Sequence, residues 1–154
     1  MKRWEREGVI ELDELDIPGE EHLKKGVAII ECVQEIPCNP CVDACPVRAI
    51  SMEHINAVPR VDYDACTGCG TCVEVCPGLA IFLVKIEGEH AQVTVPYEFV
   101  PLPEKGDRVT ALNREGEHVC DGVVKRVRKM KTPVVTIEVP REYAMEVRNI
   151  RVMS

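Results

Sequence analysis

The chain has 154 residues, nine cysteines, only six aromatic residues and a formal net charge of −7. A protein this small, with so few large side chains to bury, needs a further source of stability such as bound metal or disulfides. It contains no run of about 18 apolar residues, and its N-terminus is acidic where a signal peptide would be apolar. We therefore expect no membrane span, no secretion and a cytoplasmic location. In that setting an odd number of cysteines favours metal ligation over disulfides.

Charge is distributed unevenly along the chain. Through residue 91 there are 17 acidic and 8 basic side chains, whereas from residue 92 onward there are 9 acidic and 11 basic. This break coincides with the end of the closely spaced cysteines. It predicts an N-terminal arm over residues 1–26, a cysteine-rich domain over 27–91 and a valine-rich domain over 92–154. The overall acidity argues against general nucleic-acid binding, because phosphate contacts need clustered Lys and Arg.

The N-terminal arm contains one predicted helix. Residues 18–26 carry acids at their start, lysines at their end and a glycine stop, which matches the helix macrodipole. We expect the arm either to pack on its own domain or to lie on a partner protein, with Trp4 as the candidate anchor.

The cysteine-rich region predicts short strands and single helical turns. Short apolar runs indicate strands, and a proline with its fixed φ suits the start of a helix. The expected strands are residues 27–30, 61–63 and 81–86, and the expected helical turns are residues 46–51 and 77–81.

An internal repeat with an offset of 31 residues relates two parts of this region. The recurring residues are Cys38, Cys41, Cys45, Pro46, Ala49 and Ile50, which return as Cys69, Cys72, Cys76, Pro77, Ala80 and Ile81. In the second copy Cys66, Cys69, Cys72 and Cys76 have the spacing C-x2-C-x2-C-x3-C-P. Three cysteines at every third residue suit one corner of a four-iron cluster, and the fourth, on the turn of helix that follows, points away. A zinc ribbon would leave four cysteines unexplained, and a disulfide framework is disfavoured without an export signal.

This pattern resembles the bacterial-type ferredoxins that bind two [4Fe-4S] clusters, over about residues 27–88. The resemblance implies an α+β, pseudo-twofold ferredoxin-like domain in which each copy lends its fourth cysteine to the other cluster. By this resemblance cluster 1 is bound by Cys32, Cys38, Cys41 and Cys76, and cluster 2 by Cys45, Cys66, Cys69 and Cys72. Gly68 and Gly70 fit the same picture, since small residues let backbone amides approach the sulfurs.

The first copy departs from the regular spacing. Position 35, where that spacing requires a cysteine, holds Glu35, and the nearest upstream thiol is Cys32. Three alternatives follow: Cys32 ligates through a longer loop, Glu35 ligates in its place, or the site holds a three-iron cluster. We favour Cys32, because thiolate is the softer and preferred ligand.

From residue 92 onward the sequence predicts five strands, at residues 92–99, 107–112, 119–127, 134–139 and 145–152. Five short strands suggest a small antiparallel β-barrel, closed or nearly closed. Cys120 lies in one of these strands without a partner motif, so we expect it to be a packing residue. The basic run over residues 125–131 suits a solvated strand edge, RNA binding or docking of an acidic partner, and it lacks the aromatic residues that RNA-binding modules normally supply.

No nucleophile with its base, phosphate loop or dinucleotide fingerprint occurs, so we expect an electron-transfer protein without substrate chemistry of its own. Residues 30–41 are also similar to those of the small iron–sulfur subunits that accompany flavin-dependent amine or amino-acid dehydrogenases of the proline, hydroxyproline or sarcosine type. That resemblance implies a hetero-oligomeric complex with flavoprotein (FAD) dehydrogenase subunits, in which the clusters carry electrons onward from FAD. The alternative is a free low-potential ferredoxin whose C-terminal barrel is regulatory or binds RNA.

Overall fold

The computed structural model describes residues 18–31, 40–54, 57–76, 80–98, 102–129 and 132–152. Its helices are α2 (Glu20–Lys25), α3 (Pro40–Ala44), α4 (Thr71–Val75) and the 3-10 turn η2 (Arg141–Tyr143). Its strands are β1 (Val27–Ile30), β2 (Ile50–Ser51), β3 (Arg60–Val61), β4 (Ile81–Glu87), β5 (His90–Pro96), β6 (Arg108–Leu112), β7 (His118–Arg128), β8 (Val134–Pro140) and β9 (Asn149–Val152). The described part of the chain is thus mostly sheet with few helices. Within it, no helix has the length and apolar character needed to cross a membrane.

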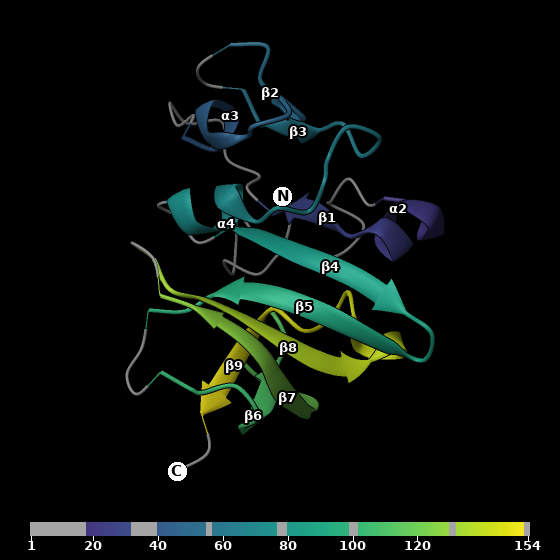
Figure 1. Cartoon of the computed structure of the whole chain (residues 1–154), viewed down its shortest axis with the longest axis vertical. Helices are drawn as coiled ribbons and strands as arrows, with labels where there is room; N and C mark the ends of the chain where they lie inside the picture. Colours follow the sequence, from purple (N-terminus) through teal and green to yellow (C-terminus); the bar gives the residue numbers. More distant parts are fainter. Residues whose placement is uncertain are drawn as a thin grey trace.

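One antiparallel sheet runs through both halves of the chain (Figure 1). Its strand order is β1-β4-β5-β8-β7-β6-β9, while β2 and β3 form a separate two-stranded sheet. Because β5 spans His90–Pro96 and pairs with β4, the boundary expected between residues 91 and 92 falls inside a strand. The cysteine-rich half therefore supplies β1 and β4 to the sheet that the valine-rich half continues.

The five strands expected after residue 92 are present, but the pairings of the described residues do not close a barrel. β1 and β9 stand at opposite ends of the strand order. The edge of β5 that a closed barrel would have to pair is occupied by β4, which in turn pairs with β1. An unpaired strand edge invites association with other chains, and pairing with the cysteine-rich half protects this edge without closure. The sheet curls instead, with β6 and β9 behind β7 and β8 in the view of Figure 1.

The curled sheet packs its inner face as an aliphatic core. On β8, Val135, Ile137 and Val139 are almost completely buried, whereas Thr136 and Glu138 between them are half-buried on the outer face. Complete burial of such aliphatic side chains stabilises a fold by about 1.5–3 kcal/mol each. The period-two alternation that predicts this strand is therefore also what fills the core.

The two copies of the cysteine repeat are folded alike. α3 and α4 are related by the same offset of 31 residues as the sequences. The pairing of Ile30 with Ile81 between β1 and β4 becomes, after that offset, the pairing of Val61 with Ile50 between β3 and β2. Two matching backbone hydrogen bonds run from Glu31 N to Ala80 O (2.7 Å) and from Asp62 N to Ala49 O (2.6 Å).

A buried carboxylate ties the end of β1 to the valine-rich half. Glu31 is only 5% exposed and accepts two hydrogen bonds from Arg114, Nε to Oε1 at 2.7 Å and Nη2 to Oε2 at 2.8 Å. Arg148 forms a second ion pair with Glu31, donates to the carbonyl of Ala144 at 2.8 Å and lies 5.4 Å from the ring centroid of Phe82. Burial lowers the pKa of Arg148, and the charge of Glu31 opposes that shift. Two cations around one carboxylate thus hold the halves together.

Candidate metal centre

Four cysteines from both copies of the repeat line one hollow. Cys45 directly follows α3, Cys66 and Cys69 lie in the loop before α4, and Cys72 lies within α4. The other lining residues are largely small or apolar: Ala28, Val47, Ile50, Thr67, Gly70 and Leu83. Cys76, the fourth cysteine of the second copy, is not among the lining residues. The fold therefore places Cys45 of the first copy beside three cysteines of the second.

The loop that carries Cys66 and Cys69 requires glycine at two positions. Gly68 and Gly70 have φ values of +71° and +84°, in the left-handed region that other residues rarely adopt. A Cβ at Gly68 would also lie 2.8 Å from the carbonyl oxygen of Gly26, just before β1. Glycine thus lets the loop pack directly on the backbone that leads into the sheet.

Backbone amides donate to three cysteine sulfurs. The bonds are Ala28 N to Cys66 Sγ (3.4 Å), Ala49 N to Cys45 Sγ (3.3 Å) and Ala80 N to Cys76 Sγ (3.4 Å). The bonds to Cys45 and Cys76 each come from the residue four positions later, and the repeat offset relates them. Amide donors directed at sulfur favour its thiolate form and stabilise the negative charge of a cluster bound through it.

The four thiols are electrostatically strained without a cation. Burial raises the pKa of Cys72 to about 12, and the charges of the neighbouring cysteines act in the same direction. For Cys69, burial acts to raise the pKa, but hydrogen bonds with Thr71 and Thr67 outweigh it and leave the pKa below its usual value. The Cys69 Sγ and Thr71 Oγ1 atoms are 3.6 Å apart. Iron bound among these sulfurs would displace the remaining protons and offset the repulsion between thiolates.

The arrangement of the thiols fits a four-iron group. Within the described ranges no three His, Cys, Asp or Glu side chains are placed to bind one metal ion together. The four thiols stand around a shared hollow instead. A [4Fe-4S] cluster takes one thiolate on each iron, so its ligands surround it, whereas a zinc ion needs four ligands converging on one point at about 2.3 Å for sulfur.

The other four predicted ligands are described only in part. Cys41 is buried on α3, and its charge contributes to the raised pKa of Cys72. Cys76 directly follows α4 and is half-buried. Cys32 and Cys38, like Glu35, lie outside the described residues.

The remaining cysteine is placed away from these ligands. Cys120 lies on β7, is half-buried and packs against the core. Burial raises the pKa of its thiol, and the nearby acidic residues add to that effect. A protonated, half-buried thiol suits packing better than ligation. Trp4, the candidate anchor of the arm, lies outside the described residues.

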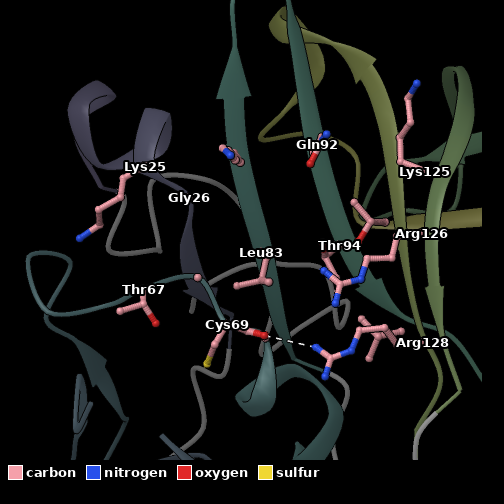
Figure 2. Close-up of a pocket in the computed structure, with 15 residues that line it drawn as sticks. Lys25, Gly26, Thr67, Cys69, Leu83, Gln92, Thr94, Lys125, Arg126 and Arg128 are labelled. Atoms are coloured by element: carbon pink, nitrogen blue, oxygen red, sulfur yellow. Dashed lines mark hydrogen bonds between the residues drawn. The ribbon is translucent and has the colours of Figure 1, made fainter. Parts of the chain in front are cut away.

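The structure also brings to the loop a residue that sequence reasoning did not assign to the site. Arg128 of β7 donates from Nη1 to the carbonyl oxygen of Cys69 at 3.3 Å (Figure 2). The basic run over residues 125–131 was the available signal, but a run of charges does not show which side chains reach a loop 59 positions away in the sequence. The C-terminal half therefore touches the cysteine loop directly.

Comparison with known proteins identifies one part of the chain. Neither the search of curated proteins nor the search of solved structures found a match. A family model described as a 4Fe-4S binding domain matches residues 59–82, which include Cys66, Cys69, Cys72 and Cys76. Residues 59–82 are therefore a 4Fe-4S binding domain.

Proposed function

We propose that this chain is an electron-transfer subunit that carries single electrons through two [4Fe-4S] clusters. The observation that carries the proposal is the hollow lined by Cys45, Cys66, Cys69 and Cys72, three of which belong to the matched domain over residues 59–82. Four thiolates around one hollow are the full ligand set of a four-iron cluster. These residues would hold cluster 2.

A second cluster is supported by the likeness of the two copies. Cluster 1 would be held by Cys32, Cys38, Cys41 and Cys76. The amide bond to the sulfur of Cys76 has its counterpart at Cys45, the residue that joins the hollow of the other copy. Equivalent environments for these two cysteines support equivalent roles, in which each crosses to the cluster of the opposite copy.

The irregular spacing of the first copy has a structural counterpart. After the offset of 31 residues, Cys66 corresponds to Glu35, and Ala28, which donates to Cys66, corresponds to Pro59. Proline has no N–H to donate. The first copy therefore lacks both the thiol and the amide donor of this contact, which supports a ligand from another position. Cys32 is the nearest thiol.

The chain's own residues would set the properties of both sites. A bound cluster supplies reversible one-electron chemistry, and the chain determines where that charge is stabilised. The amides of Ala28 and Ala49 point at ligand sulfurs, and such donors raise the reduction potential by stabilising the extra negative charge. Ile50 and Leu83 make the wall of cluster 2 apolar and limit water access. α3 and α4 pack together, so electrons would have a short path between the sites.

A flavoprotein partner is the proposed biological context. It rests on the similarity of residues 30–41 to the iron–sulfur subunits of flavin-dependent amine or amino-acid dehydrogenases. An FAD-containing subunit would oxidise the substrate, and this chain would carry the electrons onward. Co-purification of the chain with FAD-containing subunits tests this context, and a stable monomer that unrelated reductases reduce freely would contradict it.

The function is tested by iron and sulfide analysis with EPR spectroscopy of anaerobically prepared protein. We expect about eight irons in the wild type, since two four-iron clusters are present. Cys32→Ser should alter one cluster and Glu35→Ala should leave both unchanged. A three-iron signal in the wild type, or loss of a cluster in Glu35→Ala alone, would overturn the proposed ligands of cluster 1.

A further inference from the structure

A basic groove lies beside the loop that carries Cys69. Its charged lining consists of five cations and no carboxylate: Lys25, Lys85, Lys125, Arg126 and Arg128. These side chains come from α2, β4 and β7, and polar side chains of β5 and β8 lie between them (Figure 2). The whole chain carries a net charge of −7, so the groove reverses the charge of the molecule locally.

Part of this positive charge is uncompensated. Lys85 pairs with Glu87 at 2.9 Å, and Lys125 approaches Glu138 at 3.8 Å. Arg126 is exposed and has no ion-pair partner among the described residues. The remaining two cations donate only to neutral carbonyl groups: Lys25 to Tyr63 and Asp64, and Arg128 to Cys69. Three cations of the groove therefore keep their charge available for an anionic partner.

The groove and the hollow of cluster 2 share one wall. Thr67, Cys69, Gly70 and Leu83 line both. Cys69 is exposed, and Arg128 contacts its carbonyl oxygen from the groove side. A protein seated in the groove would thus be separated from the proposed cluster by a single segment of chain, which is a short route for an electron.

We propose that this basic groove is the docking surface for an acidic face of a redox-partner protein, through which cluster 2 exchanges electrons. The inference rests on the proposed function. In each event one electron leaves the reduced cluster and enters the oxidised centre of the partner, or passes in the reverse direction, and no bond is formed or broken. The acidic remainder of the molecule repels such a partner, so the groove also selects its orientation. The lining contains no aromatic residue on which nucleic-acid bases would stack, so a protein partner is favoured over RNA.

Charged one-electron oxidants test the field of the groove. The reduced holoprotein is mixed anaerobically with anionic Co(III)-EDTA or with cationic hexaamminecobalt(III), and cluster oxidation is followed by stopped-flow absorbance. Arg126→Glu is compared with Arg151→Glu, an equal charge change at an exposed arginine of β9 that does not line the groove. At low ionic strength we expect Arg126→Glu to slow the anionic oxidant about threefold or more, and this effect to vanish near 0.5 M salt. Arg151→Glu should have a much smaller effect.

Poly-glutamate serves as a probe for the acidic partner surface. It should slow the anionic oxidant with the wild-type protein and do so less with Arg126→Glu. Equal effects of the two substitutions, or tighter binding of a single-stranded RNA than of poly-glutamate, would overturn the docking proposal. Iron and sulfide analysis of the same samples separates the two possible failures. Missing clusters would refute the proposed function, whereas intact clusters without a groove effect would refute the docking surface alone.

Discussion

At Gly68 the need for glycine has two independent causes. Its φ of +71° is left-handed, and a Cβ would meet the carbonyl oxygen of Gly26 at 2.8 Å. Gly88, between β4 and β5, also has a positive φ, +59°, but a Cβ there would meet nothing within 4 Å. The two positions therefore separate the backbone cost of a side chain from its steric cost at the cysteine loop.

We expect Gly68→Ala to be more damaging than Gly88→Ala. Each forces alanine into the left-handed region at a cost of about 1–2 kcal/mol. Gly68→Ala must in addition push the loop away from Gly26, which displaces Cys66 and Cys69. Urea unfolding of the holoprotein should show the larger loss for Gly68→Ala, and iron analysis should show lower occupancy in that variant only. Equal losses of stability from both substitutions would contradict the close backbone packing.

Between elements, the strongest described link is the carboxylate of Glu31. It joins the end of β1 to Arg114, in the turn between β6 and β7, and to Arg148, just before β9. All three side chains are largely buried, at 5%, 12% and 3% exposure respectively. Desolvation makes a buried ion pair only weakly stabilising as a whole, but removal of one partner leaves the other charges buried and uncompensated.

Glu31→Gln should therefore destabilise the holoprotein by about 3–5 kcal/mol. The matched control is Glu20→Gln, which breaks the exposed ion pair with Arg141 and should cost less than about 1 kcal/mol. The urea midpoints of both variants measure these losses. Similar midpoints would show that the buried cluster does not hold β1 against the C-terminal half.

At the scale of the whole molecule, the two halves share one sheet. β4 belongs to the cysteine repeat and is also the neighbour of β5, so the ligand loop and the basic strand β7 belong to one framework. This continuity explains how Arg128 reaches Cys69 and why the groove lies against the cysteine loop. A charge change on β7 is therefore expected to be felt at cluster 2.

The parts that the sequence predicts are those with local signals. The spacing of Cys66, Cys69 and Cys72 and the offset that links them to Cys45 predict the residues that line the hollow, and period-two alternation predicts the strands after residue 92. The pairing of β5 with β4 was not predictable, because either strand edge has the same backbone groups. Glu31 meets Arg148 across 117 residues, and no local pattern marks such a contact.

The central claim is that Cys45 of the first copy completes the site of Cys66, Cys69 and Cys72. EPR spectroscopy of the reduced protein, with one serine substitution at a time, tests it most directly. Cys45→Ser and Cys66→Ser should alter the same cluster signal, Cys76→Ser should alter the other, and Cys120→Ser should leave both unchanged. If Cys76→Ser instead altered the signal that Cys66→Ser alters, each copy would bind its own cluster and the crossed arrangement would be wrong.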